Sequence, residues 1–175
     1  MKKTPKQRFR DFINRQDFSE IPAVPLIVGD HAACISGLSL KEICKSGKKL
    51  AYALEQAFLI YNHDLVIVFS DVTVEAEAMG VVLNFPEHDH PHIIEYPEIV
   101  KIQPKNPLKD GRMPEILYAA ECCIKSIGDE VQICVAVKDP FIPATSCDVP
   151  MKTPKENVKA MIRSIRITEK QFMDA

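Results

Sequence analysis

Residues 64–85 read Asp64-Leu-Val-Ile-Val-Phe-Ser-Asp71-Val-Thr-Val-Glu75-Ala-Glu-Ala-Met-Gly80-Val-Val-Leu-Asn-Phe85. The apolar run predicts a strand over Leu65–Ser70, buried on both faces as in a parallel sheet. It ends abruptly at Asp71, and a carboxylate at the exit of a buried strand indicates a site residue. Asp is also a favoured cap for a helical turn, such as the one expected near Val74. Both roles for Asp71 stay open here.

Two further apolar runs, one earlier and one later in the chain, predict further parallel strands. Ile21–Gly29, with prolines near its start, predicts the first strand, and Val131–Val137 predicts the third. Because parallel strands bring their carboxyl ends to one edge, we expect Asp71 to share a concave surface with the other exits. The substrate-binding residues expected there are Gly29, Asp30, His31, Ser70, Lys138, Asp139 and Phe141.

Asp71 follows three apolar residues that point to the same side of the strand, Leu65, Ile67 and Phe69. Such neighbours raise the pKa of a carboxyl unless a cation or a hydrogen-bond donor offsets the desolvation. His31 and Lys138 are the expected partners.

Helix signals separate the predicted strands. A cap and a proline at Thr4-Pro5 open the first helix, and Gly128 stops another. The expected helices cover a first segment from Thr4, Leu40–Cys44, Lys48–Tyr61, Met113–Ile127 and a last segment from Thr153; Val81–Phe85 and His92–Tyr96 predict a β-hairpin.

Three buried strands, each followed by a helix, predict an α/β fold with right-handed parallel crossovers. We interpret residues 1–175 as one partial domain: the N-terminal half of a (β/α)8 TIM barrel, about three strand and helix units with an inserted β-hairpin, truncated before the fourth strand.

Composition excludes some classes of partner. The chain has 175 residues and a formal net charge of −2, which does not favour nucleic-acid binding. No apolar run is long enough to span a membrane, and the basic N-terminus lacks the apolar region of a signal peptide. We expect a cytoplasmic protein, with its six cysteines as reduced thiols.

Several motifs together resemble the uroporphyrinogen decarboxylase (URO-D) superfamily. The stretch from Phe69 to Phe85 is similar to the family's second strand, following loop and hairpin, which implies that Asp71 is the family's active-site aspartate. Asp17–Pro25 resembles the approach to the first strand, and Asp139-Pro140-Phe141 resembles the turn after the third. Pro107–Pro114 is similar to a connection in the corrinoid-dependent methyltransferases, of the methylcobamide:coenzyme M type.

Substrate charge helps to choose between the chemistries of this superfamily. Uroporphyrinogen is a polycarboxylate, and its decarboxylase supplies arginines just after the first strand. Here that place, Val28–Cys34, has no arginine, and none occurs between Arg15 and Arg112. Asp30 and Asp71 would also repel a polyanion. True uroporphyrinogen decarboxylation is therefore the alternative, and the methyltransferase branch fits better.

The resemblance implies transfer of a methyl group from a corrinoid protein to a small thiol, which zinc holds as a thiolate. In the family the zinc ligands are a His-x-Cys pair and a later Cys in the second half of the barrel. We therefore expect zinc and a corrinoid in the complete enzyme, neither held by this chain, and no activity from this chain alone.

Two alternatives remain open. His88, His90 and His92 have the spacing of metal ligands, as do His31 and Cys34, although a solvated hairpin tip and an unrelated His and Cys are the simpler interpretations. The chain could also be a non-catalytic interaction module, a half-barrel that pairs with a second half-barrel or with itself through its uncovered apolar flanks.

Overall fold

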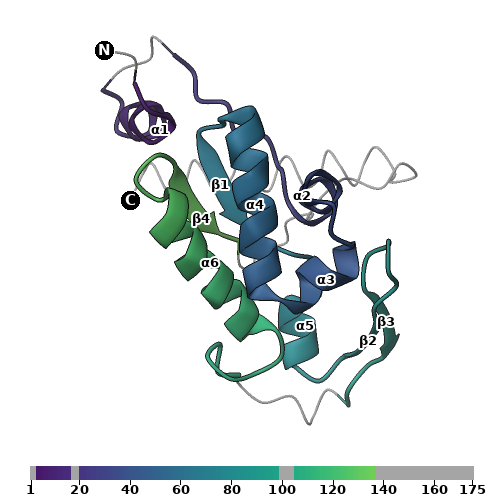
Figure 1. Ribbon diagram of the computed structural model, residues 1–175. Helices are drawn as coiled ribbons and strands as arrows, with labels where there is room; N and C mark the ends of the chain where they lie inside the picture. The colour runs from purple at the N-terminus through teal and green to yellow at the C-terminus, as the bar shows by residue number, and fades with distance from the viewer. Residues whose placement is uncertain (1–2, 17–19, 99–104, 137–175) are drawn as a thin grey trace, which may run out of the picture. The chain divides into compact units, whose positions relative to one another are not determined.

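The structure is a computed structural model, and it describes residues 3–16, 20–98 and 105–136. Its elements (Figure 1) are α1 (Pro5–Ile13), α2 (Gly29–Ser36), α3 (Leu40–Lys45), α4 (Gly47–Tyr61), β1 (Leu65–Val68), α5 (Val74–Ala78), β2 (Val82–Asn84), β3 (His92–Glu95), α6 (Met113–Ile127) and β4 (Gln132–Val135). None of the helices in these ranges is long and apolar enough to cross a membrane. The last expected helix, from Thr153, lies outside the described residues.

Local sequence signals explain where two helices begin. Thr4 caps α1 through a reciprocal pair of hydrogen bonds with Gln7, and Pro5 occupies the first turn. Ser39 and Glu42 form the same capping box at the start of α3. The helix expected from Thr4 and the short one at Leu40–Cys44 are thus confirmed.

The sheet that carries the site consists of β1 and β4, which pair in parallel with Val66 opposite Ile133 and Val68 opposite Val135. Two of the three expected strands are therefore confirmed, each shorter than its apolar run. Val66 and Val68 point to one face and are buried, while residues on the other face of β1 are half-buried.

Helices α4 and α6 lie side by side over the buried face of this sheet (Figure 1). They approach closely at Gly47, where a Cβ atom would lie 2.1 Å from the carbonyl oxygen of Glu115. The Glu115 carboxylate also accepts a hydrogen bond from the Gly47 N–H at 2.6 Å. A side chain at position 47 would push the two helices apart, so glycine is required there. The core between helices and sheet includes Ile43, Leu50, Leu54, Val66, Val68, Ala119, Cys123 and Val131.

The expected first strand, Ile21–Gly29, is wrong as a strand. Residues 21–28 form neither strand nor helix, and Gly29 already begins α2. Pro22 and Pro25 lack the N–H groups that a ladder needs, and Ile21 is 80% exposed. The segment nevertheless follows β1: Ala23 exchanges hydrogen bonds with Asp64 at the start of β1.

The other end of this segment meets the exit of β1. A Cβ atom at Gly29 would lie 2.4 Å from the carbonyl oxygen of Ser70. Ala23 to Gly29 and Asp64 to Ser70 have the same separation in sequence, so the segment occupies the position of a parallel neighbour without forming the ladder.

Strands β2 and β3 pair antiparallel, with Leu83 opposite Ile93 and an irregularity between Val82 and Leu83. They lie within the two segments that the sequence indicates. The hairpin stands beside α3 (Figure 1), where the Lys41 N–H contacts the carbonyl oxygen of Glu87 at 3.5 Å and its ammonium pairs with the Glu87 carboxylate at 3.2 Å. The described elements are thus a mixed α/β arrangement with one parallel strand pair and a separate hairpin.

Candidate active site

Asp71 lies just beyond the carboxyl end of β1, and its side chain is almost completely buried. Its Oδ1 accepts hydrogen bonds from the backbone N–H of Thr73 at 2.9 Å and from the Thr73 hydroxyl at 2.5 Å. Its Oδ2 accepts one from the Ser70 hydroxyl at 3.0 Å. These bonds hold the turn that leads into α5. Thr73, not Asp71, is the residue that immediately precedes α5, and it makes no side-chain capping bond.

The cationic partner of Asp71 is Arg112, the residue that precedes α6. Its Nη1 lies 2.6 Å from Oδ2 of Asp71, and its Nη2 lies 3.2 Å from Oδ1. The expected partners were His31 and Lys138. That prediction is wrong for His31, which instead contacts the Tyr61 hydroxyl at 2.9 Å. Lys138 lies outside the described residues.

The remaining donors of Arg112 reach three other residues. Nε binds Glu77 on α5 at 2.5 Å, Nη1 binds the carbonyl oxygen of Cys44 at 3.0 Å, and Nη2 binds the Thr73 hydroxyl at 3.1 Å. A guanidinium has five N–H donors, and here the two bonds to Asp71 and these three use all of them. Arg112 therefore has no donor left for an anionic ligand unless one of these bonds breaks.

The arginine sets the charge of the buried carboxyl. Burial opposes ionisation of Asp71, but the hydrogen bonds and charge of Arg112, with those of Thr73, lower its pKa to about 2. In return, although burial disfavours the cation, Asp71 and Glu77 raise the pKa of Arg112. Burial and the nearby charge of Asp71 raise the pKa of the Cys44 thiol, which stays protonated. The site thus holds an ion pair beside a neutral thiol.

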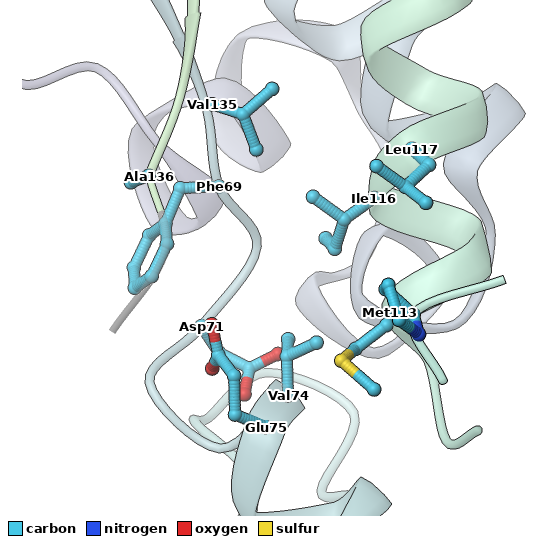
Figure 2. Close-up of a pocket in the computed structure, with 10 residues that line it drawn as sticks. Phe69, Asp71, Val74, Glu75, Met113, Ile116, Leu117, Val135 and Ala136 are labelled. Carbon is cyan, nitrogen blue, oxygen red and sulfur yellow. The ribbon is translucent and has the colours of Figure 1, made fainter. Parts of the chain in front are cut away.

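A cavity of about 90 Å³ opens between the ends of β1 and β4 and the first turns of α6. Figure 2 shows Asp71 and Glu75 at one end of it, with Phe69 facing Ile116 and Leu117 across the opening. Its other lining residues are Val74, Pro107, Met113, Val135 and Ala136. An engineered cavity of roughly 150 Å³ holds benzene, so this one has room for a small alkyl group. The arrangement offers apolar walls with carboxylates at one end.

The expected site residues are only partly brought together. Gly29 and Ser70 meet at the strand exits, next to Asp71. Asp30 and His31 lie on the exposed side of α2, a helix that the sequence pattern did not predict despite the adjacent Ala32 and Ala33. Asp30 pairs with His90 of the hairpin loop at 2.7 Å. Asp139 and Phe141, like Lys138, lie outside the described residues.

The histidines of the hairpin region are exposed, and His92 lies 3.3 Å from Asp89. Within residues 3–16, 20–98 and 105–136, no three His, Cys, Asp or Glu side chains are grouped so that they could hold a metal ion. Arg112 was also missed as a site residue. The position of Arg112 in the sequence could have indicated its role. It lies in the methyltransferase-like connection Pro107–Pro114, after a long stretch without arginine.

A match to a protein-family model shows to which family the chain belongs. The model of the family described as uroporphyrinogen decarboxylase (URO-D) matches residues 4–146, most of the chain. The chain belongs to the URO-D family. No curated protein matches this URO-D chain.

Among solved structures, the URO-D chain is similar to a methyltransferase from Methanosarcina mazei, with a TM-score of 0.66 and 19% sequence identity. The match covers 77% of the URO-D chain and 42% of the methyltransferase chain, so the URO-D chain spans less than half of that protein. At this identity the likeness concerns the fold. It supports a partial TIM-barrel-like arrangement for the strands and helices described above.

Proposed function

We propose that this URO-D chain is part of a methyltransferase that moves a methyl group from a corrinoid protein to a small thiol. In this reaction the thiol sulfur bonds to the methyl carbon while the bond from that carbon to the corrinoid breaks, and the thiol proton is released. Asp71 is the proposed site acid. The other proposed site residues are Gly29, Asp30, His31, Ser70, Lys138, Asp139 and Phe141.

The observation that carries this proposal is the use of all five Arg112 donors within the protein. Arg112 is the arginine nearest the strand exits among the described residues, and it neutralises Asp71 instead of facing the cavity. Glu75 adds a carboxylate to the cavity wall. The described part of the site therefore offers a polycarboxylate no free arginine donor, whereas a small alkyl group fits the apolar walls. This favours methyl transfer over uroporphyrinogen decarboxylation.

The described residues do not fit the zinc that the family resemblance implies. They contain no metal-binding group, and Cys44, the thiol beside Asp71, is buried with a raised pKa. We propose that the zinc ligands of the complete enzyme come from outside the described residues. The described residues supply the buried carboxylate and the apolar cavity.

A second candidate is a non-catalytic interaction module that pairs with another half-barrel or with itself. It is favoured by large apolar side chains on the outer faces of α4 and α6, where Leu59 is 68% exposed and Ile124 is 59% exposed. Exposed apolar surface of this kind marks an interface.

The deciding experiment uses the whole reading frame that contains this chain. The purified protein is incubated with methylcobalamin and a panel of small thiols, and thioether formation is followed by mass spectrometry. We expect thioether formation that Asp71→Asn strongly lowers and Glu121→Gln, an exposed control on α6, leaves unchanged. Turnover of uroporphyrinogen without thioether formation would establish the decarboxylase instead, and neither activity would favour the interaction module.

A further inference from the structure

We propose that Arg112 is the positioning residue of this site: it fixes the orientation and charge of Asp71, and the β2–β3 hairpin controls Arg112 through Phe85. The inference rests on the proposed function only in taking Asp71 as the site's acid.

The backbone of Arg112 is held by the start of α6, where its carbonyl oxygen accepts hydrogen bonds from the N–H groups of Glu115 and Ile116. From this fixed point the side chain reaches the β1 exit, α5 and the end of α3. The guanidinium is planar, and its two bonds to Asp71 define the plane of the carboxylate. A lysine could supply the charge at this position but not the two parallel bonds.

Asp71 has no spare acceptor capacity in this arrangement. Its two oxygens accept five hydrogen bonds, from Ser70, twice from Thr73 and twice from Arg112, whereas a carboxylate offers about four acceptor positions. A ligand can bind Asp71 only by replacing a donor. The longest of the five bonds, from Nη2 of Arg112 at 3.2 Å, is the one most easily exchanged. Glu77 would keep the arginine paired while this exchange occurs.

The hairpin reaches this network through Phe85, just beyond the end of β2. The centroid of its ring lies 4.8 Å from Cζ of Arg112 and 4.4 Å from Nζ of Lys45. An aromatic ring close to a cation attracts it, so Phe85 attracts both Arg112 and Lys45. The hairpin is also anchored by the pairs of Lys41 with Glu87 and of Asp30 with His90. Movement of the hairpin would therefore withdraw a contact that helps to hold Arg112 against Asp71.

The other ionisable groups near Asp71 do not replace Arg112. Cys44 on α3 is a protonated thiol, and Glu75 and Glu77 on α5 are acids. Loss of the arginine contact would leave the buried carboxyl with acidic neighbours and only the neutral donors of Ser70 and Thr73, which disfavours its charged form.

The test is an NMR titration of the full chain labelled with 13C at the aspartate carboxyl carbons. The Asp71 signal is identified by its absence in Asp71→Asn. In the unchanged protein we expect Asp71 to stay ionised down to about pH 2. Arg112→Lys should raise the midpoint by about one pH unit or more, and Phe85→Leu should raise it by a smaller amount. Ile94→Ala, an exposed control in the same hairpin, should leave it unchanged.

An ordinary aspartate midpoint near 4 in the unchanged protein would overturn the proposal, as would a midpoint that Arg112→Lys leaves in place. A Phe85→Leu titration identical to that of Ile94→Ala would overturn the role of the hairpin. If Arg112→Lys does not fold, the Asp71 titration midpoints of the unchanged protein and of Phe85→Leu still test the proposal. The titration does not depend on methyl transfer, so failure of the proposed function would be seen separately.

Discussion

Arg112 and Asp71 meet side by side, with N–O distances of 2.6 and 3.2 Å, although one precedes α6 and the other follows β1. The pair joins the strand exit to the helix that covers the sheet. Because both side chains are buried, this contact matters for the stability of the fold. When one member of a buried ion pair is removed, the other is left as an uncompensated charge in a poorly solvated environment.

Asp71 should make the protein more stable at neutral pH than in acid. Its pKa is about 2 in the folded state, below the ordinary value of 3.8, so its contribution is fully present above about pH 4 and is lost as the pH falls toward 2. The contribution amounts to about 2 kcal/mol. Urea unfolding between pH 2 and pH 6 should show a flatter pH dependence for Asp71→Asn than for the unchanged protein. Parallel curves for the two proteins would contradict this.

Arg112→Met should lower the free energy of unfolding by about 3–5 kcal/mol, because it leaves Asp71 buried without its cation. Adding Asp71→Asn should recover part of the loss, since the uncompensated charge is then gone. Denaturant unfolding of both single variants and the double variant measures the coupling. Lys125→Met, which breaks an exposed pair with Glu121, is the control and should change stability by less than about 1 kcal/mol. Additive effects of the two site changes would refute the coupling.

Gly29→Ala should destabilise the protein by about 1–3 kcal/mol, because the new Cβ would lie 2.4 Å from the Ser70 carbonyl oxygen and must push residues 21–28 away from β1. Thermal unfolding measures the loss. Cys34→Ala, at an exposed position of the same helix, should have little effect. Equal melting temperatures for the two variants would show that the close approach is unimportant.

Leu117→Trp should block the cavity with little loss of stability, since Leu117 lines it yet is 38% exposed. In the thioether assay we expect a raised KM for the thiol, with a melting temperature close to that of the unchanged protein. Tyr118→Trp places the same side chain on the next, non-lining position of α6 and should leave KM unchanged. If both variants behave alike, the cavity is not the thiol site.

The chain should self-associate through the exposed apolar residues of α4 and α6. Sedimentation velocity over a range of concentrations should show few monomers, and Leu59→Lys with Ile124→Lys should shift the distribution toward the monomer. Lys48→Glu, an exposed change on α4, serves as the control. A sharp monomer peak for the unchanged chain, with cooperative thermal unfolding, would contradict this expectation.

Elements encoded by local signals were predictable from the sequence. The cap at Thr4 and the apolar runs in β1 and β4 depend on neighbouring residues, so their existence and type followed directly. The first strand was mispredicted because a strand also needs a hydrogen-bonded partner, and the prolines of residues 21–28 remove donors from its backbone. A composition typical of β-strands does not by itself give a segment the backbone hydrogen bonds to a neighbouring strand.

The candidate site was predictable only at Asp71 and its immediate neighbours. That Gly29 approaches Ser70 follows from parallel geometry, and the resemblance to a known family pointed to the same place. The partnership of Asp71 with Arg112 depends on how α6 packs over the sheet, and no local pattern reports such packing. His31 was wrongly expected as the partner because a strand over Ile21–Gly29 was expected to bring it to the strand exits, whereas His31 lies in α2 and its side chain contacts Tyr61.

Residues 21–28 lie along β1 without a ladder, so their amide hydrogens should exchange with solvent much faster than those of Val66 and Val68. Local opening that exposes this segment breaks few backbone hydrogen bonds, whereas exchange in β1 requires its separation from β4 and the covering helices. The edge of the parallel pair beside this segment would then be uncovered from time to time while the rest of the protein stays folded. A protease that cuts within residues 21–28 would detect this opening before any global unfolding.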